Sequence, residues 1–183
     1  MKKLVLSLLL VPFNLLSQVP VNGDSLVVYF GKLINEYRLD NELVPIKIDV
    51  NLKGFTESWS LYQSKVGSVS HGDGDNSFQK RVELYPNISS NKRCLENCAM
   101  AYTPVTPISK NTNIQSSQTE LLPYIDKMMR GKQTQMDYAI YALIIWKNSP
   151  EHNSTMLDPE IKTFYVSAST NNGRTYFSFI GVD

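Results

Sequence analysis

The sequence lacks the short motifs that identify the best-known catalytic sites. Its 183 residues include only two cysteines and two histidines. It contains no His-Glu-x-x-His, no Cys-x-x-Cys and no Gly-x-Ser-x-Gly, so no local pattern indicates a zinc peptidase, a clustered-cysteine metal site or a serine hydrolase. No internal repeat is visible. A functional site must therefore be assembled from residues that are distant in the sequence.

An excess of charge of either sign is also absent. There are 18 lysines and arginines against 17 aspartates and glutamates, a formal net charge of +1. Without a basic field nothing indicates a nucleic-acid partner, and without an acidic field nothing indicates a disordered tail. The 42% of hydrophobic and 19% of charged residues are typical of a globular protein, and the length suits one domain or one domain with a tail.

The N-terminal apolar run is too short to cross a membrane. Residues 1–18 begin with two lysines, continue with apolar residues from Leu4 to Leu16 and end with Ser17-Gln18. This order predicts a secretory signal peptide, whereas the alternative, a buried N-terminal helix, lacks an amphipathic period. We therefore predict a signal peptide over residues 1–18, a single domain over residues 19–183 without a transmembrane anchor, and a secreted or periplasmic protein.

Helical periodicity dominates most of the remaining sequence. Apolar residues recur at helical spacing in four segments: 24–37, 51–67, 119–130 and 134–149. In the second segment the apolar residues form one regular stripe, made of Leu52, Phe55, Trp59, Tyr62 and Val66. Pro150 is expected to end the fourth helix.

The C-terminus changes to the pattern of strands. Residues 161–169 and 175–182 are β-branched and aromatic and flank "NNGR", which predicts an antiparallel hairpin. Residues 81–84 and 99–103 are candidates for further strands. Because the helices come first, the hairpin last, and strands and helices do not alternate, the sequence predicts an α+β fold with helices packed on a small antiparallel sheet.

The two cysteines, Cys94 and Cys98, stand four residues apart. In an exported protein an even number of cysteines suggests a disulfide. In a regular helix, however, this spacing lies near the outer limit of disulfide geometry. The sequence leaves both a Cys94–Cys98 bridge and two free thiols open.

Five stretches in this order resemble the CAP superfamily of cysteine-rich secretory, antigen 5 and pathogenesis-related proteins, in particular its bacterial secreted SCP-domain members. They are "LINEYR" in the first helix, His71 after the second helix, "LENCA" at 95–99, "WKNSPEHNSTML" at 146–157, and the closing hairpin. The resemblance covers residues 25–183. It implies a three-layer α-β-α sandwich, in agreement with the predicted elements.

The resemblance also implies a central cleft with two histidines and two acidic residues, which holds a divalent cation in some members. The matching positions here are His71, Glu96 and His152. The fourth position departs from the family, because Ser149 stands where many members have glutamate; Glu151 is the candidate substitute.

Two functions fit such a cleft. Two imidazoles and a carboxylate suit zinc or another divalent cation, with His71 and His152 as ligands and Glu96 as the candidate catalytic base of a metal-assisted hydrolase or peptidase. The resemblance favours a non-enzymatic secreted module that binds a small ligand such as a lipid, a sterol or a wall fragment.

Each of these residues also has a purely structural interpretation. His71 would stabilise a loop, His152 would interact with the end of the fourth helix, and Glu96 would accept hydrogen bonds from backbone amides.

Overall fold

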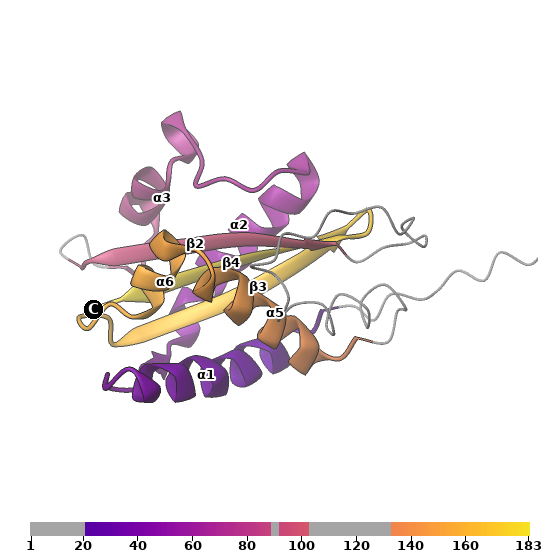
Figure 1. Cartoon of the computed structure of the whole chain (residues 1–183). Coiled ribbons are helices and arrows are strands. Elements are labelled where there is room, and N and C mark those ends of the chain that lie inside the picture. Colours follow the sequence, from indigo (N-terminus) through magenta and orange to yellow (C-terminus); the bar gives the residue numbers. More distant parts are fainter. Residues whose placement is uncertain (1–20, 89–91, 103–132) are drawn as a thin grey trace, which may run out of the picture.

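The computed structural model of the protein describes residues 21–88, 92–102 and 133–183. The predicted signal peptide and the helix predicted over residues 119–130 lie outside these residues. In the part that is described, a four-stranded sheet lies between two layers of helices (Figure 1). None of the described helices is long and apolar enough to cross a membrane.

The elements follow one another along the described chain. In order they are α1 (Gly23–Asp40), β1 (Lys47–Ile48), α2 (Lys53–Val66), α3 (Phe78–Leu84), β2 (Cys94–Tyr102), α5 (Gln135–Lys147), α6 (Pro150–Met156), β3 (Thr163–Asn171) and β4 (Arg174–Val182), with single 3-10 turns at Val50–Leu52 and Gly74–Asn76.

The sheet has the strand order β1-β3-β4-β2, so β2 forms one of its edges. The predicted hairpin is confirmed: β3 pairs with β4 in antiparallel register, and Asn172 and Gly173 turn the chain with φ values of 48° and 71°. Positive φ at both turn residues is the geometry that matches the twist of paired strands. The sheet is mixed, because the two-residue strand β1 runs parallel to β3.

Side chains alternate between the two faces of the sheet and define the layers. Phe164 of β3 contacts Phe30 of α1 with ring centroids 6.1 Å apart, whereas Ser167, three residues further along β3, lies 3.2 Å from Ser60 of α2. Helix α2 therefore covers one face, and α1 and α5 cover the other, which gives the α-β-α sandwich (Figure 1).

The core on the α1 side is aromatic. The rings of Trp146 and Phe30 meet edge to face, with centroids 5.5 Å apart and an angle of 85° between their planes. Both rings pack against Phe179 of β4. All three side chains are completely buried. This packing fixes the end of α5, and therefore the position at which α6 begins.

The interface between α2 and the sheet is more polar than the sequence pattern indicated. Helix α2 ends at Gly67, as predicted, and this glycine has the left-handed conformation, with φ 74°. The end of the predicted apolar stripe is nevertheless exposed, 40% for Tyr62 and 53% for Val66. The buried face of the helix carries polar residues instead: Thr56, Ser60, Gln63 and Ser64. The apolar stripe was therefore assigned correctly only up to Trp59.

Two further boundaries differ from the prediction. Residues 81–84 are helical, as part of α3, and are not a strand. The strand predicted at 99–103 exists but begins earlier, at Cys94. Pro150 does end the preceding helix, and it also starts α6, because proline at the first helical position needs no hydrogen-bond partner for its nitrogen.

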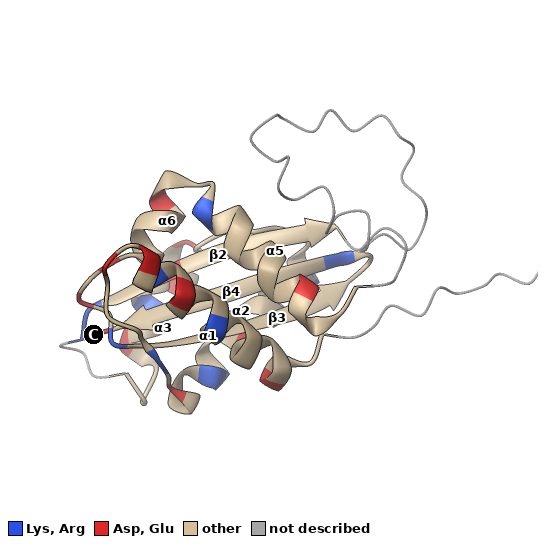
Figure 2. Ribbon diagram, turned by 60° about the horizontal axis from the view of Figure 1, so that its bottom comes forward, with Lys and Arg blue, Asp and Glu red and all other residues tan. Residues whose placement is uncertain are grey.

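Acidic and basic residues are interspersed on the ribbon seen from the side of α1 and α5 (Figure 2).

Candidate functional site

The site is built on the edge strand β2, which presents different residues to the two faces of the sheet. Asn97 pairs with Phe179, which faces α1, and therefore lies on the α5 and α6 side. Glu96 and Cys98, one residue before and after it, face α2. Strand geometry alone thus brings Glu96 and Cys98 to one surface.

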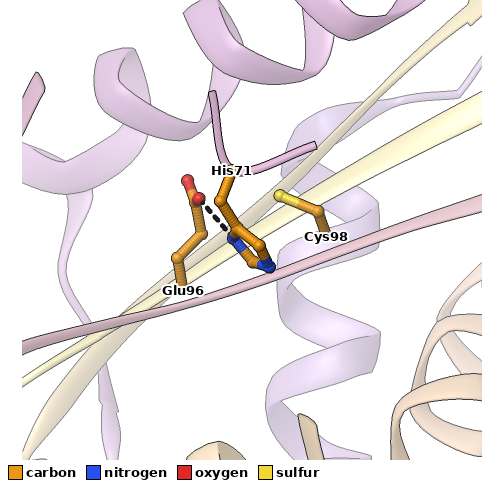
Figure 3. A group of neighbouring side chains, drawn as sticks. All are labelled: His71, Glu96 and Cys98. Atoms are coloured by element: carbon orange, nitrogen blue, oxygen red, sulfur yellow. Dashed lines mark hydrogen bonds and ion pairs between the residues drawn. The ribbon is translucent and has the colours of Figure 1, made fainter. Parts of the chain in front are cut away.

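His71 reaches Glu96 from the loop that follows α2. Its Nδ1 lies 2.9 Å from Oε2 of Glu96 (Figure 3). The loop is held by Trp59, whose indole nitrogen donates to the carbonyl oxygen of Ser70 at 3.0 Å. Gly72 turns the chain immediately afterwards with φ 77°. The His71 side chain remains 52% exposed, whereas that of Glu96 is 1% exposed.

Arg81 of α3 binds the same carboxylate from the other side, and no sequence pattern indicated this contact. Its Nη1 donates to Oε1 of Glu96 and its Nη2 to Oε2, both at 2.9 Å. The guanidinium lies 3.6 Å above the ring of Trp59, and Nη2 also donates to the carbonyl oxygen of His71. Such a bidentate, stacked pair is among the strongest charge-assisted contacts. Both oxygens of Glu96 are therefore already engaged.

His152 approaches from the opposite face of the sheet, on α6. The side-chain amide of Asn97 donates to the carbonyl oxygen of His152 at 2.9 Å, and Arg38 of α1 donates to the carbonyl oxygen of Met156 at 2.7 Å. These two bonds hold the short helix against β2 and α1. The ring centroids of His71 and His152 are 6.3 Å apart, with an angle of 46° between the planes. The two histidines thus meet beside the edge of β2.

The pKa values of the two imidazoles are shifted in opposite directions. The hydrogen bond from His71 to Glu96 raises the pKa of His71 above its usual value of 6.5. Burial, and after it the nearby charge of His71, lower the pKa of His152 below that value. The pair therefore takes up its first proton on His71, and His152 is protonated only at lower pH.

The remaining predicted residues lie at the start of α6. Ser149 is the residue before the first turn, where its carbonyl oxygen accepts a hydrogen bond from the backbone of Asn153. Glu151 is exposed, and its charge adds slightly to the raised pKa of His71 and partly offsets the lowering of the pKa of His152.

Cys94 and Cys98 are both free thiols, so of the two alternatives left by the sequence the disulfide is wrong. The helical spacing assumed for them does not apply, because both lie on β2. Four residues of extended chain separate Cα atoms by about 13 Å, far beyond the ~7 Å that a disulfide spans. Cys98 is instead a site residue that the sequence analysis missed: its sulfur, a ring nitrogen of His71 and a carboxylate oxygen of Glu96 lie within 4.8 Å of one another (Figure 3).

An open hollow of about 700 Å³ lies next to this cluster, between α3, β2 and α6. Its lining combines apolar and polar side chains, namely Phe78, Val82, Cys94 and Leu95 with His71, Gln79, Glu83, Lys92, Glu96 and Thr155. A hollow of this volume is in the range of small-ligand sites.

Comparison with known proteins finds similarity in structure only. No family model and no curated protein matches the sequence. An outer surface protein of Borrelia burgdorferi has a similar structure, with a TM-score of 0.59 and 12% identity over 90% of this chain and 96% of that protein.

Two SCP proteins are also similar. A cysteine-rich secretory protein of Staphylococcus aureus gives a TM-score of 0.51 at 14% identity, over 88% of this chain and 39% of that one. An extracellular SCP-domain protein of Bacillus anthracis gives a TM-score of 0.53 at 13% identity, over 86% of this chain and 41% of that one. The protein therefore has a bacterial CAP-like fold, as the sequence predicted.

The divalent cation that this fold family implies does not fit the residues as they are arranged. An ion shared by two imidazoles lies about 3 Å from each ring centroid, so the 6.3 Å between the rings of His71 and His152 is the upper limit for sharing. The carboxylate that would complete the site is bound to Arg81 through both oxygens. A divalent ion with Glu96 among its ligands would require this buried pair to separate.

Proposed function

We propose that the protein is an exported binding module without catalytic activity, and that it holds a small ligand in the hollow between α3, β2 and α6. The residues that line the hollow suit a ligand with an apolar body and a polar end. Phe78, Val82 and Leu95 would contact the apolar part, and Lys92 and Glu83 would contact the polar part. Lipids, sterols and wall fragments with a lipid or peptide portion have this character.

Export is proposed from the lysine-led apolar run of residues 1–18. In support, the two similar SCP proteins are described as secretory and extracellular.

One observation carries the choice of binding over hydrolysis. A general base must present a free lone pair to water or to the substrate. Both oxygens of Glu96 accept hydrogen bonds from Arg81, and Oε2 also contacts His71. Glu96 is better suited to hold the loop and α3 in place than to accept a proton. This arrangement supports the binding module over the metal-assisted hydrolase that would use His71, His152 and Glu96.

The test compares two aspartate substitutions on α3. Val82 lines the hollow, whereas Leu84, on the same helix, is 69% exposed. The probes are a fluorescent sterol, a fluorescent fatty acid and a mixture of soluble wall fragments. We expect at least one probe to bind the purified protein, with an affinity at least tenfold weaker in Val82→Asp and unchanged in Leu84→Asp.

A peptide library distinguishes the alternative function. The proposed module leaves the library intact. Turnover that disappears in both His71→Ala and His152→Ala, together with bound metal, would establish the hydrolase instead. Failure of all three probes to bind, or equal loss in the two aspartate variants, would reject the hollow as the ligand site.

A further inference from the structure

The cluster of His71, Glu96 and Cys98 has a chemistry that the proposed ligand hollow does not use. We propose that Cys98 and His71 together bind one soft monovalent metal ion, of the class of copper(I) and silver(I). Glu96 orients the imidazole in this site and is not a ligand. The proposal is independent of the organic ligand suggested above.

Geometry is the first argument. Contact with Glu96 occupies Nδ1 of His71 and leaves Nε2 as the nitrogen with a free lone pair. A histidine held by a carboxylate in this way is the usual arrangement around protein-bound metals. In Figure 3 the imidazole lies between Glu96 and Cys98. An ion bonded to one sulfur and one imidazole nitrogen separates them by at most ~4.3 Å. The sulfur of Cys98 and a ring nitrogen of His71 lie within 4.8 Å of each other, which is close to this limit.

Ligand type is the second argument. Thiolate sulfur selects soft ions such as copper(I) over hard ones. Cys98 forms no disulfide and is only 3% exposed, so the ion would be shielded from water. The half-exposed ring of His71 is the route by which an ion would reach the sulfur.

Charge is the third argument, and it selects a monovalent ion. Arg81 and Glu96 already form a neutral buried pair. A Cys98 thiolate adds one negative charge, which a single positive charge cancels. A divalent ion would leave one net positive charge beside Arg81, and an uncompensated charge is costly in a buried site.

Binding replaces the thiol proton. Burial raises the pKa of Cys98, so without an ion the group is a neutral thiol. When the sulfur–metal bond forms, the sulfur–hydrogen bond breaks and the proton leaves to solvent. When the imidazole of His71 is neutral, one proton is thus released for each ion bound; a protonated imidazole releases a second proton, from Nε2. Neither the metal nor the sulfur changes oxidation state.

The experiment titrates the purified protein with silver(I) in chloride-free buffer, and with copper(I) under anaerobic conditions against the chelator bicinchoninate. We expect one ion per chain, with absorbance in the near ultraviolet from the metal–thiolate bond. Cys98→Ser should weaken binding at least ~100-fold and remove this absorbance, and His71→Gln should weaken it ~10- to 100-fold. Cys94→Ser is the matched control, because Cys94 lies on the same strand, and it should bind like the unmodified protein.

Several outcomes would overturn the proposal. They are the absence of stoichiometric binding, unchanged affinity in Cys98→Ser, equal loss in Cys94→Ser, or zinc binding tighter than copper(I). If Cys98→Ser does not fold, as judged by circular dichroism, His71→Gln provides the test, because the side chain of His71 is half-exposed. An affinity for the metal ion that is unchanged in His71→Gln would reject the site. Sterol or lipid binding in the hollow should be unaffected by Cys98→Ser, so the two proposals fail separately.

Discussion

Arg81 and Glu96 form a buried bidentate ion pair, with two N–O distances of 2.9 Å, between the seven-residue helix α3 and the edge strand β2. A helix of this length has little stability of its own. The pair, with the stacking of Arg81 on Trp59, therefore explains why α3 forms, and α3 in turn makes one wall of the hollow. The same contact determines the architecture of the site and limits what Glu96 can do.

Removal of the arginine should be strongly destabilising. In Arg81→Met the Glu96 carboxylate loses its charge partner while it stays buried, which typically costs about 3–5 kcal/mol. Urea unfolding measures the change in free energy. Lys80→Met is the control, since its contact with Glu83 is exposed and such pairs contribute about 0–1 kcal/mol. Equal and small effects in both variants would show that the Arg81–Glu96 pair does not hold α3 in place.

The sequence indicated the fold better than the site, for a physical reason. Periodicity and turn chemistry are local, so the termination of α2 at Gly67 and the hairpin at Asn172-Gly173 were visible in the sequence. Helix α3 was not, because its stability comes from Arg81 reaching a strand residue 15 positions away. Short elements held by tertiary contacts leave little periodic signal.

The missed role of Cys98 has a different origin. The spacing of Cys94 and Cys98 was evaluated for a helix, whereas the segment is a strand. In a strand the informative spacing is two residues, and it places Cys98 on the same face as Glu96. Recognition of the strand would have predicted that Cys98 lies beside Glu96. It would not have predicted that His71, in the loop after α2, lies beside them.

The two histidines should titrate on opposite sides of pH 6.5. The bond to Glu96 raises the pKa of His71, whereas burial and the neighbouring charge lower that of His152. Because the chain contains only two histidines, their ring signals in an NMR titration are readily assigned with His71→Asn and His152→Asn variants. Glu96→Gln should bring the pKa of His71 back towards 6.5. The reverse order of the two pKa values would contradict the geometry of the pair.

The same shifts predict how stability depends on pH. The contribution of His71 is fully present below pH 6.5, where the unfolded histidine is also charged, and is lost as pH rises through its raised pKa in the folded protein. His152 acts in the opposite sense, and stability falls as pH drops from 6.5 through its lowered pKa. Unfolding measured from pH 5 to pH 8 should show the first slope disappear in His71→Asn and the second in His152→Asn.

The cysteines should differ in reactivity while the protein is folded. Burial raises the pKa of Cys94 to about 11, so little reactive thiolate exists at neutral pH, and labelling by iodoacetamide should be slow. Cys98 is 3% exposed and should be labelled only after unfolding. Mass spectrometry of the non-reduced protein should find two labels in denaturant and one without it. A mass without labels in denaturant would show the disulfide that the extended geometry of β2 excludes.

The loop that carries His71 should depend on one of its two glycines far more than on the other. Gly72 and Gly74 both have positive φ, 77° and 50°, where a side chain costs about 1–2 kcal/mol. A Cβ on Gly72 would also collide with the backbone carbonyl oxygen of Asn76, whereas a Cβ on Gly74 meets no atom within 4 Å. Gly72→Ala should therefore destabilise the protein at least twice as much as Gly74→Ala in urea unfolding. Gly72→Ala should also return the pKa of His71 towards 6.5, because the displaced loop loses the contact with Glu96. Equal effects of the two variants would show that the loop accommodates the extra atom without moving His71.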